Sequence, residues 1–464
     1  MSDPKRSRPR APTTALDLSL GALARNDPDQ CLRIAIPVLD DYGAGAPAID
    51  VIGRAAVTVG AMGVARVAFE TAARALALQG LAAQAIAAAV AVERLTSNGS
   101  LLTELAGVFG ADADRSGDPH VAPPPLASER VTELGDLSRE QLLALAQKKI
   151  EALRKTLPAK LPPRARLPLW GTLPTGAFER FARVMEVRVF GAGHAAIHEG
   201  ERGGSLFVVA RGEVRIARRS LAPKAAPDLD ATTHLPRESM PAELPGDLEE
   251  LAVLGAESVF GELALLTEAP RAASVHTTRA SILLEAPPAA LAAAAKEVPA
   301  LGAELLAFSR SRLVQNLLRA APLLREVPPS DRVALAAAFE ARSYAPGDVL
   351  FRQGSEATGL FLLASGEVEV RATQPDGSDL VVGAVRPGEC VGEISLVLRR
   401  PTTATVIARA PTAALVLSPE QFMGIVRRHP TLLATLYDLA VARDEQLLQV
   451  TAQAAEEADD LVIV

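Results

Sequence analysis

Two hydrophobic periods divide the chain. From about residue 16 to 110, alanine and leucine recur at the spacing of a helix, most clearly in 64–80 and 81–95. Glycines separate these stretches, as they do in turns between paired helices. From about residue 166 onward, short runs alternate apolar and polar residues and close on glycine, which is typical of strands and turns. The pattern predicts a helical N-terminal domain followed by strand-rich domains.

A linker with one helix separates these regions. Residues 111–136 are rich in Pro, Asp, Ser and Gly and have no apolar period. Ser138 is followed three residues later by Gln141, the capping-box pattern, which predicts a helix that continues to about Leu157. The proline-rich residues 158–168 end it.

The strand-rich part contains the same element twice. The matching segments are 190–200 and 344–354, 205–216 and 359–370, and 260–275 and 391–406. The first two pairs are offset by 154 residues and the third by 131, so the first copy carries a 23-residue insertion. Helical residues follow each copy, at 291–320 and 418–450. We therefore expect two strand-rich β-barrels, each with C-terminal helices.

These patterns give an α+β multidomain fold. The Pro-rich polar residues 221–247 have the composition of a surface loop and are assigned to the insertion. The predicted segments are a disordered tail (1–15), a helical domain (16–110), a linker (111–165), domain A (166–310), domain B (311–450) and an acidic tail (451–464).

Composition narrows the class of protein. The 464 residues are 49% apolar but only 3% aromatic, so the cores are packed mostly with Ala, Leu and Val. A net charge of −7 argues against binding nucleic acid through the whole surface. Two cysteines cannot form a disulfide scaffold. The best apolar run, 81–92, is too short to span a membrane, and the basic N-terminus lacks the apolar stretch of a signal peptide. We expect a cytoplasmic protein that binds neither DNA nor membranes.

Residues 260–275, FGELALLTEAPRAASV, carry the most specific motif. They resemble the phosphate-binding cassette of the cyclic-nucleotide-binding domain family, and the resemblance covers about 170–450. The first copy is particularly similar to the regulatory subunit of cAMP-dependent protein kinase. Both barrels are then expected to have the jelly-roll-like fold of that family. Residues 80–95 also resemble half of a tetratricopeptide (TPR) repeat, although an Ala-rich helical bundle of no special kind explains them as well.

The cassette's residue types suit a cyclic phosphate. Arg271 can meet its charge with a planar fork, and Gly261 lets the backbone approach the sugar. Glu262 is an acceptor for the ribose 2′-hydroxyl, and the turn that begins at Leu263 presents amides to an anion. The resemblance assigns ligand contacts to the matching residues Gly261, Glu262, Leu263, Arg271, Ala272 and Ala273.

Ala272 bears on which cyclic nucleotide is bound. In relatives that prefer cGMP, a Thr or Ser often follows the cassette arginine, whereas here Ala272 does. Ala272 and Ala273 are also small enough for their amides to reach a phosphate oxygen. The sequence therefore favours cAMP as the ligand, with cGMP as the alternative.

The second copy departs from the motif at the arginine. Gly392 and Glu393 remain, but Thr402 and Thr403 stand where the first copy has Arg271 and Ala272. The single neutral hydroxyl of Thr402 therefore replaces the charged guanidinium of Arg271. Arg399 and Arg400 lie a few residues too early and would need a rearranged loop. We expect this degenerate site not to bind cyclic nucleotide and domain B to be a structural or docking lobe.

Other chemistry finds no support in the sequence. His194 and His198 lack further metal ligands nearby, and Ser205 and Ser274 have no partnered base. No Walker loop, kinase signature or helix-turn-helix is found. The basic segment 154–170 lacks the compact form of a kinase pseudosubstrate. We therefore expect no enzyme activity, no catalytic residue and no metal site.

Three functional hypotheses remain. The first is a cAMP sensor for signal transduction that couples ligand binding in domain A to protein–protein interactions. The second is a constitutive helical scaffold whose barrels do not bind ligand. The third, the regulatory subunit of an unidentified enzyme, differs from the first only in its partner. The unknown protein partner would dock on the helical domain, or on the terminal DDLVIV as an added strand, unless that end is frayed or packed on its own protein.

Overall fold

The computed structural model describes most of the chain in two compact units. The described residues are 14–40, 45–96, 99–114, 131–165, 167–219, 248–262, 271, 273–320, 328, 338–374 and 377–461. The first unit comprises Met1–Glu199, Ser205–Phe260 and Ala273–Glu304, and the second comprises Gly200–Gly204, Gly261–Ala272 and Leu305–Val464. Residues 1–13 of the predicted tail (1–15) and the predicted insertion (221–247) lie outside the described residues, whereas Thr14 and Ala15 are described at the start of the first helix.

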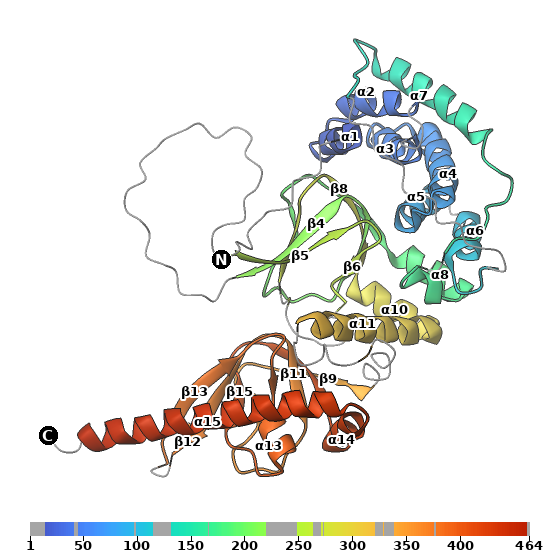
Figure 1. Ribbon diagram of the computed structural model, residues 1–464. Coiled ribbons are helices and arrows are strands. Elements are labelled where there is room, and N and C mark those ends of the chain that lie inside the picture. The colour runs from blue at the N-terminus through green and yellow to red at the C-terminus, as the bar shows by residue number, and fades with distance from the viewer. Residues whose placement is uncertain are drawn as a thin grey trace, which may run out of the picture. The chain divides into compact units, whose positions relative to one another are not determined.

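The N-terminal region is helical, as predicted. Its helices are α1 (Ala15–Ala24), α2 (Pro28–Val38), α3 (Gly45–Thr58), α4 (Met62–Leu78), α5 (Ala82–Thr96) and α6 (Ser100–Phe109). Each packs against the next in sequence (Figure 1). Small residues allow this close approach: a Cβ at Gly53 would lie 2.8 Å from the Phe69 ring. The resemblance to tetratricopeptide repeats stays a prediction.

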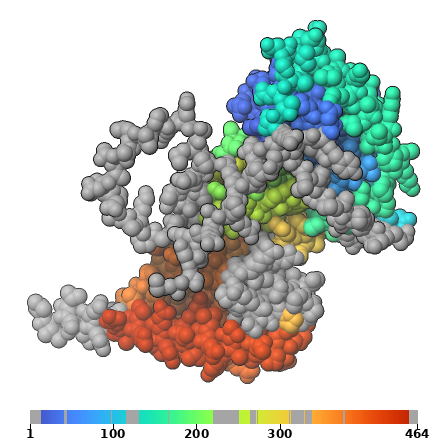
Figure 2. All heavy atoms as spheres, turned by 45° about the horizontal axis from the view of Figure 1, so that its top comes forward, coloured from blue at the N-terminus to red at the C-terminus, as the bar shows by residue number. Residues whose placement is uncertain are grey.

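The predicted linker helix is α7 (Arg139–Arg154). Ser138 accepts a hydrogen bond from the backbone N–H of Gln141, whose side chain in turn accepts one from the Ser138 N–H at 2.8 Å. This capping box confirms the predicted start, whereas the helix ends three residues before the predicted Leu157. Helix α7 packs on α2, α3 and α4 and covers the outside of the helical region (Figure 2).

The first strand module consists of two antiparallel four-stranded sheets. It follows η1 (Trp170–Thr172) and α8 (Thr175–Val184), and its sheets have the orders β1-β8-β3-β6 and β2-β7-β4-β5. The strands are β1 (Glu186–Phe190), β2 (Ala195–Ile197), β3 (Leu206–Arg211), β4 (Glu213–Arg219), β5 (Leu248–Gly255), β6 (Val259–Phe260), β7 (Ser274–Thr277) and β8 (Ser281–Ala286). Helices α10 (Pro288–Glu297) and α11 (Pro299–Ala320) follow.

The second module repeats this arrangement, with sheet orders β9-β16-β11-β14 and β10-β15-β12-β13. Its strands are β9 (Glu340–Tyr344), β10 (Val349–Phe351), β11 (Leu360–Ser365), β12 (Val368–Thr373), β13 (Asp379–Val385), β14 (Cys390–Val391), β15 (Thr405–Ala408) and β16 (Thr412–Leu417). Its helices are α13 (Glu393–Leu398), α14 (Pro419–Arg428) and α15 (Pro430–Leu461). The predicted repeat is confirmed.

Two details differ from the expectation. In the described residues each module is a sandwich of two separate sheets, because no strand pairing joins the sheets into a closed barrel. Helix α15 continues past residue 450 to Leu461, since Ala, Glu and Gln dominate this stretch and are good helix formers. Asp459–Leu461, the start of the terminal DDLVIV, are therefore helical and do not form a strand; residues 462–464 lie outside the described part.

The helical region and the first sandwich belong to one unit. Helix α5 packs on β1, β3 and β8, and α1 packs on β1. The buried Asp17 of α1 pairs with Arg279 and lies 3.8 Å from Arg211 at the end of β3. These contacts connect predicted domains whose boundaries stay predictions; α11 runs across the boundary predicted between 310 and 311.

Candidate cyclic-nucleotide site

The backbone of Arg271 is fixed by a turn of the first module. Its N–H donates to the Glu201 carbonyl and its carbonyl accepts from the Gly200 N–H, both at 2.9 Å. The turn needs glycine, because Gly200 has a φ of +82°. The guanidinium then lies beside the start of the cassette, with Nη1 donating to the Gly261 carbonyl at 3.4 Å. The structure thus brings Arg271 next to Gly261.

Glu262 is held between the cassette and a helix. Gly261 is left-handed, with a φ of +83°, and the Glu262 side chain that follows is only 12% exposed. Its Oε1 lies 3.8 Å from Arg312 Nε on α11. Burial raises the pKa of Glu262, because the loss of solvation outweighs a backbone hydrogen bond and the attraction of Arg312.

The other predicted contacts are placed only in part. Leu263 and Ala272 lie outside the described residues. Ala273 is described and directly precedes β7. The assignment of these residues to a ligand stays a prediction.

Thr402 occupies the position of Arg271 in the second module. Its N–H donates to the Ser355 carbonyl at 2.9 Å and its carbonyl accepts from the Gly354 N–H at 2.8 Å. The Thr402 hydroxyl, in a residue only 5% exposed, donates to the Arg352 carbonyl and accepts from the Ser355 N–H. The hydroxyl therefore completes its own turn. Thr403 lines a cavity beside it.

Glu393 has a close cationic partner. Gly392 before it has a φ of +89°, and a Cβ there would lie 2.3 Å from the Gly359 carbonyl oxygen. Glu393 begins α13 and is 2% exposed. Its Oε1 lies 2.7 Å from Nη1 of Arg443 on α15. The same guanidinium donates to the Cys390 carbonyl.

The two arginines on the C-terminal helices were missed by the sequence reasoning. Arg312 and Arg443 each come 50 residues after the cassette glutamate, at the same offset of 131 that relates Glu262 to Glu393. Extending the repeat alignment into the helices would have found them. The nearby Arg400, in contrast, pairs with Asp444 of α15, and Arg399 caps α13 in the left-handed conformation.

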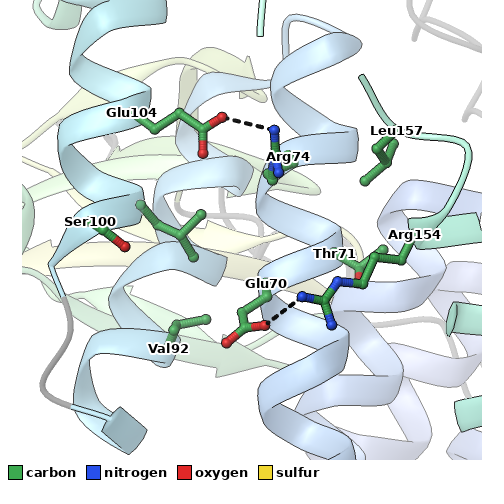
Figure 3. A pocket seen from close by; sticks show the side chains of 9 residues that line it. Glu70, Thr71, Arg74, Val92, Ser100, Glu104, Arg154 and Leu157 are labelled. Carbon is green, nitrogen blue, oxygen red and sulfur yellow. Dashed lines mark ion pairs between the residues drawn. The ribbon is translucent and has the colours of Figure 1, made fainter. Parts of the chain in front are cut away.

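A separate cavity lies in the helical region. Its volume is about 240 Å³, and its charged groups pair with one another: Arg74 with Glu104 at 3.1 Å and Arg154 with Glu70 at 3.7 Å (Figure 3). The charges of these side chains are therefore balanced within the cavity. Among the described residues, no group of three or more His, Cys, Asp and Glu side chains could hold a metal. No described helix is long and apolar enough to cross a membrane.

Comparison with known proteins identifies the class of the repeated module. A family model described as "Cyclic nucleotide-binding domain" matches residues 341–429, from β9 to the end of α14. This chain therefore contains a cyclic-nucleotide-binding domain. The first sandwich has the same strand order.

Among curated proteins the chain is similar to regulatory subunits of cAMP-dependent protein kinase. The type II regulatory subunit of Drosophila melanogaster is 32% identical over 152 residues, which are 32% of this chain and 37% of that protein. The regulatory subunit of Colletotrichum orbiculare is 30% identical over 200 residues, 39% of this chain and 45% of that one. The chain thus matches less than half of the length of either relative.

Among solved structures, the regulatory domain of Toxoplasma gondii PKA with cAMP is 22% identical, with 59% of this chain and 92% of that chain covered and a TM-score of 0.28.

Proposed function

We propose that this chain is a non-enzymatic regulatory protein whose first module binds a cyclic nucleotide, with cAMP preferred. The observation that carries the proposal is Arg271. Its backbone is held by the turn at Gly200 and Glu201, and its guanidinium lies beside the Gly261 carbonyl at the start of the cassette. A permanently charged fork held at this point suits a cyclic phosphate.

The surrounding residues take complementary roles. Glu262 accepts a hydrogen bond from the ribose 2′-hydroxyl, and Gly261 leaves room for the sugar. The amides at Leu263, Ala272 and Ala273 complete the contacts to the phosphate. The curated relatives are named as regulatory subunits of cAMP-dependent kinases, which supports cAMP over cGMP.

Ligand binding is coupled to helix α11 through Glu262. The contact from Glu262 to Arg312 is long, at 3.8 Å. A ligand hydroxyl that donates to the Glu262 carboxylate therefore changes the strength of this contact. The ligand can shift the position of α11 only by its difference in affinity for the two arrangements. The helical region of the first unit supplies the docking surface for a protein partner.

Calorimetric titration of the full chain with cAMP and cGMP tests this function. We expect one cAMP site, weakened by about 100-fold or more in Arg271→Ala because a charged, two-pronged hydrogen bond is lost. Arg271→Lys, which keeps the charge but loses the fork, should be intermediate. Arg202→Ala, an exposed arginine on the same turn, is the matched control and should change affinity little.

Two outcomes would contradict the proposal. If neither nucleotide binds, the constitutive scaffold becomes the better hypothesis. If Arg271→Ala binds cAMP as tightly as the unmodified chain, the ligand is held elsewhere.

A further inference from the structure

Helix α7 covers one face of the helical region with few apolar side chains. It packs on α2, α3 and α4 (Figure 1), and its buried residues are Leu142, Ala146 and Ile150. Their spacing of four places them in one narrow stripe along the helix. Only three of its 16 residues are therefore buried, whereas α4 buries eight of 17.

Three ion pairs join α7 to the helical region, and each has its base on α7 and its acid on the other side. They are Arg139 with Asp29 at 2.7 Å, Lys149 with Asp40 at 2.5 Å, and Arg154 with Glu70 at 3.7 Å. These side chains are partly exposed, and that of Asp40 is 69% exposed, so salt screens the pairs. The face under α7 thus favours a basic helix and holds it by contacts that salt weakens.

The chain before α7 is held by its backbone. Pro37 lies inside α2 and has no N–H, so the Arg33 carbonyl four residues earlier lacks its helical donor. The Leu134 N–H donates to this carbonyl instead, at 3.2 Å. The Arg33 guanidinium in turn donates to the carbonyls of Gly135 and Leu137. Helix α2 therefore offers both a donor and an acceptor to a passing main chain.

The chain after α7 is held in the same way. The Arg74 guanidinium of α4 donates to the carbonyls of Pro158 and Ala159, at 2.9 and 2.8 Å, and Leu161 is buried. Main-chain carbonyls are the same in every sequence, so these contacts do not depend on the side chains of the segment that is bound. Residues 131–161, which we call the belt, are thus a basic helix between two segments held by their backbones.

We propose that the face of α2, α3 and α4 under the belt is the surface on which a protein partner docks, and that the partner presents a basic amphipathic helix. The belt occupies this surface as an intramolecular competitor, so the partner docks only when the belt opens. The surface recognises an apolar stripe with a spacing of four, together with basic side chains beside it. The inference rests on the proposed function only for the existence of a partner, and its tests use no cyclic nucleotide.

Hydrogen exchange of the unmodified full chain, followed by mass spectrometry, tests whether the belt opens. We expect the amides of α7 to exchange faster than those of α4 and α5, because α7 opens without them. Raising the salt concentration from about 0.05 to about 0.5 M should speed the exchange of α7 about tenfold, since three exposed ion pairs are screened. Helices α4 and α5 are the controls and should not respond.

A labelled synthetic peptide of residues 131–161, followed by fluorescence anisotropy, tests the surface itself. In the full chain with Leu142→Asp and Ile150→Asp the belt is released, and this chain should bind the peptide. The unmodified chain should bind it at least about tenfold more weakly, because its own belt competes. Thermal unfolding reports whether the variant is folded, and the exchange experiment decides the proposal even if it is not.

Two altered peptides test what the surface selects. A peptide with Ile150→Asp loses part of the apolar stripe and should not bind the released chain. A peptide with Lys149→Glu places like charges opposite each other and should bind several-fold more weakly. Asp40→Lys in the released chain should restore the binding of this second peptide, since the ion pair is then formed with its charges exchanged.

The proposal is overturned if α7 exchanges no faster than α4, or if its exchange does not respond to salt. It is equally overturned if the released chain is folded and does not bind the peptide, or if Lys149→Glu leaves peptide binding unchanged. A chain that binds no cyclic nucleotide would refute the proposed function and leave each of these results to be judged by itself.

Discussion

The two strand modules share one chain path and differ in the side chain that closes the cassette. Arg271 and Thr402 are held by the same pair of backbone hydrogen bonds, to turns that begin at Gly200 and Gly354. The fold therefore accepts either residue without rearrangement. In one module this position offers a charged fork, and in the other its hydroxyl is used by its own turn. The two modules thus differ in cassette chemistry on the same backbone arrangement.

The acid that follows the cassette glycine shows a second difference. Glu393 lies 2.7 Å from Arg443 and is almost fully buried. Glu262 lies 3.8 Å from Arg312 and is more exposed. Helix α15 is thus tied closely to its module, and it also packs on α13 and β13 (Figure 1). The ion pair between Glu262 and Arg312 of α11 is longer and more exposed.

We expect the largest difference in stability between the two modules when each arginine is replaced with methionine. Arg443→Met leaves Glu393 buried without its cation, and we expect the second module to lose about 3–5 kcal/mol. Arg312→Met should cost less than Arg443→Met, because its contact with Glu262 is longer and more exposed. Urea unfolding followed by circular dichroism would measure both changes. Equal losses in the two variants would show that the pairs are energetically alike.

The turn between the fifth and sixth strands of each module also differs. Gly388 in the second module and Glu257 in the first have positive φ angles, of +91° and +65°, and their N–H groups donate to equivalent carbonyls, those of Leu363 and Val209. Glu257 thus adopts a conformation that favours glycine. Its Oε1 accepts from the Ala83 N–H at the start of α5, at 2.9 Å, and its buried Oε2 has no partner among the described residues.

Glu257 makes the first unit sensitive to pH. Burial raises its pKa from 4.5 to about 7, against the opposing effect of the hydrogen bond from Ala83. Its contribution to stability is complete below pH 4.5. It falls as the pH rises, because the unfolded chain releases the proton first, and it levels off above about pH 7. The loss amounts to about 3 kcal/mol.

Denaturant unfolding of the unmodified chain and Glu257→Gln at several pH values between 4.5 and 8 would measure this effect. The difference in unfolding free energy between the two proteins should change across this range. A constant difference would mean that Glu257 titrates normally. Lys296→Gln, which removes a charge elsewhere on the first module, is the control and should show no such change.

Most of the fold could be predicted from the internal sequence repeat. Alternating residues closed by glycine identified the paired sheets, and the two offsets identified equivalent positions such as Arg271 and Thr402. Backbone geometry depends on local sequence at these turns, so aligned residues occupy aligned places. The sandwich was taken for a barrel because alternation shows which residues face inward and not how the sheet edges meet.

The side-chain contacts that distinguish the two modules could not be predicted from the repeat. The pair of Glu393 and Arg443 joins residues 50 positions apart in the chain, and that of Asp17 and Arg279 joins residues 262 apart. Such contacts depend on how whole elements pack. The same holds for the Thr402 hydroxyl. It is engaged because the Arg352 carbonyl, 50 residues earlier in the chain, lies within hydrogen-bond distance. A single sequence identifies the residue types at a site more readily than their partners.

The smallest expected difference concerns the helix that follows each sandwich. Ser418 caps α14, accepting from the Gln421 N–H at 3.2 Å while the Gln421 side chain accepts from the Ser418 N–H. Pro287, at the same position before α10, provides no side-chain cap. We expect Ser418→Ala to destabilise the second module by about 1 kcal/mol, and Ser418→Asp, which keeps an acceptor, to restore most of it.

Thermal unfolding of the three proteins would measure this contribution. If Ser418→Ala unfolds like the unmodified chain, α14 is held by packing alone, as α10 is without a side-chain cap. Phe422, Ile425 and Val426 of α14 are buried in the core of the second module, so that result would assign its stability to them. A loss recovered by Ser418→Asp would instead show that the second module depends on a local hydrogen bond that the first module lacks.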